Sequence, residues 1–225
     1  MRDSLTHAIE DYLKTIYDLS VTDGRVSTSQ IAKVLDVKPA SVTGMIQKLA
    51  TADPPLVEYQ KHYGVVLTPA GEQVALEVIR HHRLLETFLH DTLGFDWDAI
   101  HDEADRLEHV ISEEFEERIA QALGDPTHDP HGDPIPDRDL RMPLQATTCL
   151  SELRPGQQAR IERVRNDDPD LLRYLSEHGL RPGVAIQVLE YSPFDDNLCL
   201  QVTDQPESIV LGPRVTRQIF VEANT

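Results

Sequence analysis

The hydrophobic pattern of this chain changes at a segment rich in Pro, Gly and Asp, GDPTHDPHGDPIPDRDL, which spans residues 124–140. Before it, apolar residues recur at helical spacing; after it, short runs such as QARIERV, VAIQVLEY and LCLQVT have the character of strands. Pro and Gly at this density interrupt both kinds of element, so the segment is predicted to be a loop or linker. The expected fold is therefore mainly α with a C-terminal β domain, a small β-barrel with one helix at 169–178.

The N-terminal part of the chain has the pattern of three helices followed by a hairpin. Apolar residues at helical spacing occupy 5–20. Thr28 or Ser29 can cap the next helix, QIAKVL, and Pro39 suits the first turn of the third, PASVTGMIQKLA. The runs LVEY and VVLT, joined by QKHYG, resemble strands. Residues 1–74 are therefore predicted to form a winged helix-turn-helix domain.

Three more helices are predicted between this domain and the end of the linker. A long one begins at Pro69, a second covers 99–111, and the segment EEFEERIAQAL forms the third. Residues 75–142 are assigned to this helical domain with its linker, and residues 147–225 to the β domain. A chain of 225 residues is long enough to give such domains real cores.

The charge of the chain is unevenly distributed. Its formal net charge is −18, which disfavours nonspecific attraction to nucleic acid because phosphates need local positive charge. All five lysines nevertheless lie within the first 61 residues, and residues 1–70 have a net charge of only −1. The N-terminal third is therefore the region predicted to face a polyanion.

Three features of the sequence bear on the compartment. The N-terminus contains acidic residues and lacks the uninterrupted apolar core of a signal peptide. No stretch approaches the roughly 18 apolar residues of a membrane span. Only two cysteines, Cys149 and Cys199, are present, so a disulfide framework is not expected. These features predict a cytoplasmic protein without membrane contact.

The stretch HDEADRLEHVISEE at 101–114 gathers potential ligands for a divalent cation. On a helix over 99–111, four of them would share about a third of the circumference: His101, Asp105, Glu108 and His109. The preceding helix adds a pair one turn apart: His82 and Glu86. Packed carboxylates repel, and a divalent cation removes the cost of burying them unpaired. Carboxylates and imidazoles without thiolates suit Mn(II) or Fe(II) better than structural zinc.

Six segments occur in this order: AIEDYLKTIYDL, IAKVLDVKPASVTGMIQKL, VLTPAGEQVA, RHHRLLETFL, LGFDWDAIHDEADRLEHVISEE and HGDPIP. Together they resemble the diphtheria-toxin-repressor (DtxR/MntR) family of metal-dependent transcriptional repressors over the first 140 residues. The tail GLRPGVAIQVLEY resembles the FeoA- or SH3-like domain of longer members. The resemblance implies a homodimer, not an enzyme, that binds a palindromic operator in double-stranded DNA only when metal is bound.

The resemblance also implies a primary metal site, with one ligand from the N-terminal helix and three from the acidic stretch. In this chain the four are Asp11, Asp105, Glu108 and His109. Iron-responsive members have Met and Cys where this chain has Asp11 and Asp105, whereas manganese-responsive members have acids. Mn(II) is therefore the expected activator, with Fe(II) as the alternative. Manganese regulators without a C-terminal domain use a second N-terminal acid, and Lys14 at that position argues against their two-metal arrangement.

Longer members of the family have an ancillary metal site. Its usual ligands match three residues here: His82, Glu86 and His101. The loop that contains HGDPIP offers two more candidates: Asp129 and His131. For a carboxylate from the C-terminal domain the candidate is Asp168, with Asp167 and Asp170 as alternatives.

Candidate DNA contacts come from the helix-turn-helix and the wing, where residues 25–61 have a net charge of +2. The third helix begins with small side chains, which allow close approach to base edges, and nearby hydroxyl and lysine groups can hold phosphates. The candidate residues are Arg25, Ser29, Lys38, Pro39, Ala40, Ser41, Thr43, Gly44, Lys48 and Lys61.

Two other functions compete with a metal-activated repressor of metal-uptake or metal-homeostasis genes. The first is a winged-helix regulator that senses no metal, in which the acidic stretch is a solvated surface. The second is a metal hydrolase that uses the adjacent pair His101 and Asp102. No nucleophile, phosphate loop or paired acid–base motif accompanies that pair, which disfavours an enzyme.

Overall fold

The computed structural model describes residues 5–165 and 168–223 and divides into two compact units. Unit 1 comprises Met1–His82, Glu108–Ile111 and Pro136–Met142. Unit 2 comprises Arg83–Leu107, Ser112–Ile135 and Pro143–Thr225. Within the described residues, no helix combines the length and apolar character that a membrane span requires.

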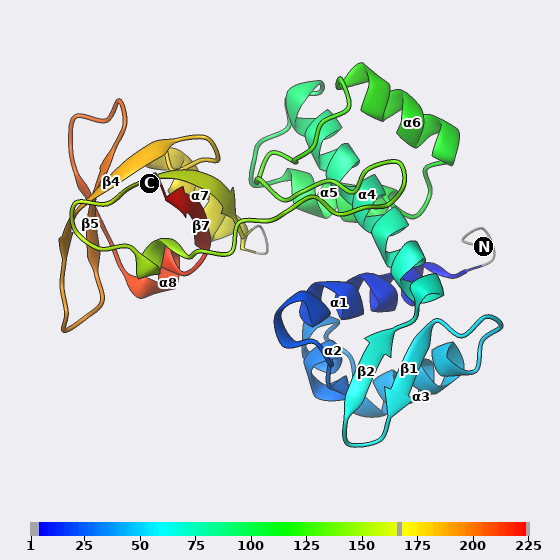
Figure 1. Ribbon diagram of the computed structural model, residues 1–225. Coiled ribbons are helices and arrows are strands. Elements are labelled where there is room, and N and C mark those ends of the chain that lie inside the picture. Colours follow the sequence, from blue (N-terminus) through cyan, green and yellow to red (C-terminus); the bar gives the residue numbers. More distant parts are fainter. Residues whose placement is uncertain (1–4, 166–167, 224–225) are drawn as a thin grey trace. The chain divides into compact units, whose positions relative to one another are not determined.

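Unit 1 contains the predicted winged helix-turn-helix, drawn in blue and cyan in Figure 1. Its elements are α1 (His7–Asp23), α2 (Thr28–Val34), α3 (Pro39–Ala50) and the antiparallel strands β1 (Val57–Gln60) and β2 (Gly64–Leu67). The core is formed by apolar residues from all of these elements, and Leu13, Ile16, Ile31 and Ile46 in it are fully buried. The predicted α3 has the observed bounds, because Pro39 starts it and Val42, Ile46 and Leu49 bury one face.

The start of α2 differs from the prediction. Neither Thr28 nor Ser29 caps it; Ser27 does. The Ser27 hydroxyl accepts a hydrogen bond from the Gln30 backbone N–H at 3.2 Å, and the Gln30 side chain accepts one from the Ser27 N–H at 2.9 Å. This reciprocal capping box satisfies two backbone donors at once, which a hydroxyl one or two residues later could not do.

The hairpin of unit 1 is joined to the segment before α2. Val26 and Val65 exchange backbone hydrogen bonds of 2.9 and 2.8 Å. Gly64 allows this close approach: it has φ +98°, and a Cβ there would lie 2.7 Å from the Val26 carbonyl oxygen.

The long helix α4 (Pro69–Asp91) begins in unit 1 and ends in unit 2, which also contains α5 (Ile100–Leu107) and α6 (Glu113–Ala122). The predicted helix over 99–111 is therefore too long, because Glu108 and His109 lie in the turn that follows α5. The chain turns at 108–110, where His109 pairs with Glu10 and Asp11 of α1, and Ser112, which has ψ 157°, then caps α6 by accepting a hydrogen bond from the Phe115 N–H. A residue in that extended conformation cannot continue a helix.

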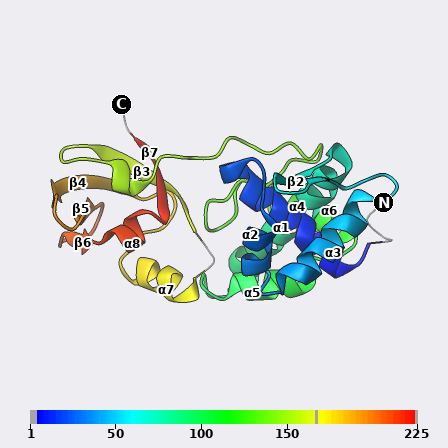
Figure 2. The same cartoon turned by 90° about the horizontal axis from the view of Figure 1, so that it is seen from below.

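The C-terminal part of unit 2 is a five-stranded antiparallel sheet in the order β6-β5-β4-β3-β7, drawn in yellow-green to red in Figure 2. The strands are β3 (Gln158–Val164), β4 (Ala185–Tyr191), β5 (Leu198–Val202), β6 (Ile209–Leu211) and β7 (Ile219–Ala223). The helical pieces are the 3-10 turn η2 (Leu150–Glu152), α7 (Pro169–Glu177) and α8 (Pro213–Thr216). Apolar residues alternate along β3 and β5, and α7 buries Leu172 and Leu175. The predicted C-terminal β domain with one principal helix is confirmed.

A short loop of unit 2, residues 129–133, packs against β3. The Val164 N–H donates to the His131 carbonyl oxygen at 2.9 Å. Arg163 forms a 3.0 Å ion pair with Asp133. A Cβ at Gly132 would lie 1.9 Å from the Glu162 carbonyl oxygen, so only glycine permits this contact.

Candidate metal centres and DNA-binding surface

Three side chains with metal-ligand chemistry converge in unit 1: Asp11 from α1, and Glu108 and His109 from the turn after α5. One ligand atom of each lies within 4.8 Å of the other two. His109 Nε2 is 2.9 Å from Asp11 Oδ1 and 3.4 Å from Glu108 Oε1. We call these three residues the primary group. It joins the N-terminal helix to a segment almost one hundred residues later in the chain.

Glu108 is the buried member of the primary group, with 1% of its surface exposed. The Lys14 ammonium donates to both carboxylate oxygens, at 3.0 Å to Oε1 and 2.7 Å to Oε2, and His82 Nδ1 lies 2.5 Å from Oε2. Burial raises the pKa of the Glu108 carboxyl, but the hydrogen bond from His82 and the charge of Lys14 outweigh it, so the pKa lies below its ordinary value. Glu108 is therefore ionised and suited to bind a cation.

His109 is oriented by a residue outside the primary group. Its Nδ1 lies 2.6 Å from Glu10 Oε2, and Glu10 is only 3% exposed. Burial lowers the pKa of His109, but the hydrogen bonds to Asp11 and Glu10 and the charge of Glu108 raise it to about 9. Because Glu10 holds Nδ1, the atom left for a metal is Nε2, which already faces Asp11 and Glu108.

A second set of ligand-type side chains lies in unit 2: Glu86 from α4, and Asp129 and His131 from the loop against β3. Their ligand atoms lie within 4.8 Å of one another, and all three residues are buried. The His131 Nε2–H donates to the Trp97 carbonyl oxygen at 3.0 Å, so Nδ1 faces Glu86. Asp129 Oδ1 accepts the backbone N–H of His131 at 2.8 Å, which fixes the carboxylate in the loop. We call these three residues the buried group.

Two atoms of the buried group fit a bound cation. His131 Nδ1 and Asp129 Oδ2 are inaccessible to solvent and make no hydrogen bond, although polar atoms in such places are nearly always paired. Burial and the neighbouring charge of Glu86 raise the pKa of Asp129 well above its ordinary value. Burial lowers the pKa of His131, but the Glu86 carboxylate, whose Oε2 lies 3.9 Å from Nδ1, and the negative charge of Asp129 outweigh this and raise it. The donor set of two carboxylates and an imidazole is one that Mn(II) or Fe(II) accepts.

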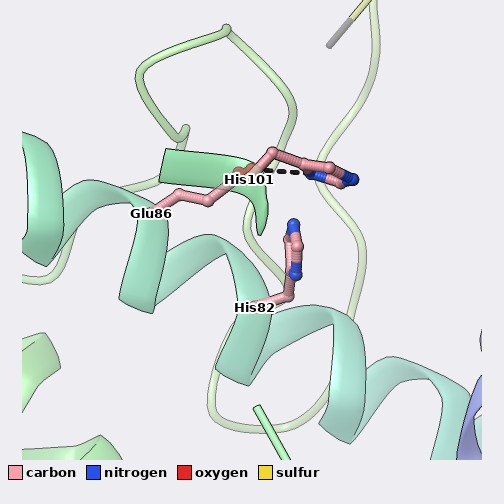
Figure 3. A group of neighbouring side chains, drawn as sticks. All are labelled: His82, Glu86 and His101. Carbon is pink, nitrogen blue, oxygen red and sulfur yellow. Dashed lines mark hydrogen bonds and ion pairs between the residues drawn. The ribbon is translucent and has the colours of Figure 1, made fainter. Parts of the chain in front are cut away.

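His101 belongs to the surroundings of the buried group. Its Nδ1 lies 3.1 Å from Glu86 Oε1, and its Nε2 lies 3.6 Å from Asp105 Oδ2. Figure 3 draws Glu86 and His101 with their contact, together with His82, which precedes Glu86 by one turn of α4. In unit 1 the imidazole of His82 bonds to Glu108. Asp102, which the hydrolase hypothesis pairs with His101, is exposed.

The predicted carboxylates of the C-terminal domain have other partners. Asp168 caps α7 by accepting the N–H groups of Asp170 and Leu171, and among the described residues it belongs to neither group. Asp170 is exposed and pairs with Arg173 at 3.0 Å. Asp167 lies outside the described residues.

The predicted DNA contacts gather on exposed parts of unit 1. Along α3 the buried residues point into the core, and the opposite face presents five exposed candidates: Pro39, Ala40, Ser41, Gly44 and Lys48. Thr43 is half-buried, and its hydroxyl donates to the Pro39 carbonyl oxygen at 3.1 Å. The remaining candidates are also exposed: Arg25, Ser29, Lys38 and Lys61. A helix face of small and cationic residues can enter a DNA groove.

Some residues that contact the primary group or the buried group could not be identified from the sequence pattern. Glu10 stands next to Asp11, but nothing in its spacing indicates a contact with His109. The sequence pattern shows Lys14 only as a missing acid, and nothing in its spacing predicts the ion pair with Glu108. The Trp97 carbonyl, which orients His131, is a backbone atom and leaves no trace in residue type.

Comparison with known proteins covers nearly the whole chain. Residues 4–65 match the family described as iron dependent repressor, N-terminal DNA binding domain, and residues 68–137 match iron dependent repressor, metal binding and dimerisation domain. Residues 148–223 match the FeoA domain. The chain is 33% identical over 204 residues to the iron-dependent repressor IdeR of Mycobacterium leprae, covering 85% of this chain and 87% of that protein. It is 32% identical over 201 residues to the diphtheria toxin repressor of Corynebacterium efficiens, covering 84% and 85%.

Solved structures are similar over the same extent. A manganese-dependent transcriptional repressor in complex with manganese is 35% identical, with a TM-score of 0.87, and the match covers 95% of this chain and 98% of the other. The manganese regulator SloR is 34% identical, with a TM-score of 0.77, and the match covers 96% and 98%.

Proposed function

The chain belongs to the iron-dependent repressor family of metal-dependent transcriptional repressors, and we propose that it is a member activated by Mn(II), with Fe(II) as the alternative. It has the DNA-binding, dimerisation and FeoA domains of that family. We infer that it acts in the cytoplasm as a homodimer on a palindromic operator and controls genes of metal uptake or homeostasis. The observation that carries the proposal is the primary group, in which two carboxylates and an imidazole converge between α1 and the turn after α5.

The choice of Mn(II) rests on donor chemistry. The ligands proposed for the primary site are Asp11, Asp105, Glu108 and His109. Oxygen donors at positions 11 and 105 suit a hard cation, whereas sulfur donors would favour softer ones. The descriptions of two structurally similar proteins as manganese regulators support the same choice.

A second metal site is proposed around the buried group. Glu86, Asp129 and His131 would supply its ligands, with His101 and His82 as further donors and Asp168 as the candidate carboxylate of the C-terminal domain. The two unbonded buried atoms, His131 Nδ1 and Asp129 Oδ2, support this proposal. A divalent cation bound there would balance the charges of Glu86 and Asp129.

The primary group suggests how metal controls DNA binding. Without metal, α1 and the 108–111 segment are joined by side-chain ion pairs such as Lys14–Glu108, and we infer that the reading heads of the dimer can still adopt several orientations. A cation bound by both segments favours one orientation, so that two recognition helices meet half-sites a multiple of about 34–36 Å apart. A shift from 1:99 to 99:1 requires about 5.5 kcal/mol of differential binding, which two primary sites could supply at under about 3 kcal/mol each.

The test is metal-dependent DNA binding. An operator is first selected from random duplexes by the Mn(II)-loaded protein, and gel shifts are then measured with EDTA, Mn(II), anaerobic Fe(II), Co(II) and Zn(II). Binding should require metal and be strongest with Mn(II). Asp11→Asn should abolish the stimulation in a dimer that is still folded, while Glu72→Asn, an exposed residue of α4, should leave it intact. Equal binding in EDTA and Mn(II) would favour the regulator that senses no metal.

The two proposed sites are separated by stoichiometry. Glu86→Ala should lower the Mn(II) bound per subunit by one in equilibrium dialysis and weaken activation less than Asp11→Asn does. Unchanged stoichiometry in Glu86→Ala would remove the second site from the proposal and leave the primary site standing.

A further inference from the structure

We propose that Lys14 competes with the metal for Glu108 and thereby sets the metal concentration at which the protein responds. The inference rests on the proposed function, because it takes Asp11, Glu108 and His109 as the ligands of a divalent cation. It assigns a regulatory role to Lys14, although the ammonium group of Lys14 cannot itself bind a metal.

The position of Lys14 is dictated by α1. Lys14 lies three positions after Asp11, so both side chains project from neighbouring parts of the same helix face. The Lys14 side chain is 18% exposed and the Glu108 side chain 2%, so the ion pair between them is largely shielded from water. Charge interactions in such places are screened much less than those at the surface.

Metal and ammonium need the same carboxylate. Glu108 Oε1 lies 3.4 Å from His109 Nε2, within the primary group, and 3.0 Å from Lys14 Nζ. Glu108 Oε2 lies 2.7 Å from the same ammonium. A cation that binds Asp11, His109 and Glu108 Oε1 must either displace the hydrogen bond from Lys14 to that oxygen or bind close to the positive charge of the ammonium group.

Two consequences follow from the charge of Lys14. In the metal-free protein the ammonium balances the buried Glu108 carboxylate and stabilises the fold. When a divalent cation enters, the same charge opposes it. The repulsion depends on the charge of the ion and not on its identity, so Lys14 should weaken binding of different divalent cations by similar factors. The donor atoms, and not Lys14, then determine the order of preference among metals.

The experiment compares neutral and charged side chains at position 14 in the full-length protein. Metal-free protein at low ionic strength is titrated with Mn(II), and separately with Co(II), in a calorimeter. The variants are Lys14→Gln, which can still hydrogen-bond to Glu108, and Lys14→Met, which cannot. Lys14→Arg keeps the charge. Lys33→Gln, an exposed lysine of α2, is the matched control.

Both neutral variants should bind Mn(II) about tenfold more tightly or better, since each tenfold corresponds to the removal of about 1.4 kcal/mol of repulsion. The gain should be similar for Co(II). The melting temperature of the metal-free neutral variants should fall, whereas Lys14→Arg and Lys33→Gln should stay close to the unmodified protein in both measurements.

Mn(II) binding that is unchanged or weaker in both neutral variants would overturn the inference, because Lys14 would then be neutral toward the metal or help it to bind. The same titration of Asp11→Asn separates this result from a failure of the proposed function. If Asp11→Asn loses Mn(II) binding while the neutral variants match the unmodified protein, only the role of Lys14 is wrong. If Asp11→Asn binds Mn(II) normally, the primary site itself is wrong.

Discussion

Replacement of Gly132 by Ala tests whether β3 holds the loop that presents Asp129 and His131. Gly132 has φ +87°, and its missing Cβ leaves room for the backbone of Glu162. The added methyl group would lie 1.9 Å from the Glu162 carbonyl oxygen and 2.8 Å from the Arg163 Cα. Backbone cannot rotate aside as a side chain can, so the loop has to move away from the strand.

Gly132→Ala should destabilise the loop for two reasons, and a control variant separates them. An L residue in the left-handed region costs about 1–2 kcal/mol, and overpacking a close contact adds about 1–3 kcal/mol. Gly124 has φ +76°, but a Cβ there meets nothing within 4 Å. Gly124→Ala therefore has only the conformational cost, and the difference between the two variants, about 1–3 kcal/mol, measures the contact of the loop with β3.

Hydrogen exchange reports this contact directly. The Val164 N–H bonds to the His131 carbonyl oxygen at 2.9 Å, so a peptide covering β3 should exchange faster in Gly132→Ala than in Gly124→Ala. Weakening by about 1–3 kcal/mol corresponds to a factor of about 5 to 150 in an equilibrium constant. If the loop positions two ligands, Mn(II) binding by the buried group should weaken by up to the same factor.

Equal exchange of β3 in the two alanine variants would refute the reasoning. It would mean that the loop adjusts to a methyl group without leaving the strand. If β3 exchanges faster in Gly132→Ala but Mn(II) binding is unchanged, the contact between the loop and β3 exists but does not contribute to metal binding.

Three further outcomes are expected. Glu10→Gln should weaken Mn(II) binding about 10- to 100-fold in calorimetry, because His109 loses the carboxylate that orients it; an unchanged affinity would exclude that role, and exposed Glu72→Gln is the control. Gly44→Ala should stabilise α3 by about 0.5–1 kcal/mol, since a Cβ there meets nothing within 4 Å, yet weaken operator binding in gel shifts; unchanged binding would place position 44 outside the DNA contact. Ser27→Ala should lower the melting temperature through the loss of about 1 kcal/mol of capping energy, and an equal loss in Ser29→Ala would contradict the observed cap.

The elements that the sequence predicted best are those whose ends are marked locally. Pro39 starts α3, and the observed helix has the predicted bounds; the run QARIERV corresponds to β3 without a shift. The helix predicted over 99–111 was too long because its hydrophobic period continues past Leu107, where the observed helix ends. Glu108 and His109 contact residues of α1, and these contacts favour a turn at that point. The hydrophobic period of residues 99–111 carries no information about contacts with a distant segment.

The candidate metal sites were likewise predictable only where the signal is local in the sequence. Ligand chemistry was visible in the acidic stretch, and family resemblance linked Asp11 to it. Spacing alone could not make that link, because ninety-six positions separate Asp11 from Glu108 and periodicity does not extend across a loop. The contacts of Glu10 with His109 and of Lys14 with Glu108 depend on how α1 is rotated about its axis relative to the turn at 108–110. That rotation depends on how the core of unit 1 packs, which the sequence pattern does not give.

That rotation is fixed by the composition of α1. At about 100° per residue, Glu10, Lys14 and Asp11 fall within roughly 100° of the helix circumference. Ile9, Tyr12, Leu13 and Ile16 fall within a similar arc on the other side, and all four are buried in the core that α1 shares with α2 and α3. Any movement that brings Asp11 toward a metal therefore moves the apolar face as well, and with it the recognition helix. Close packing transmits small displacements as rigid-body shifts. With Asp11 as the proposed ligand, α1 would both bind the metal and form a wall of the core that it shares with α2 and α3, so metal binding would reorient α3 without any intermediate chain of side chains.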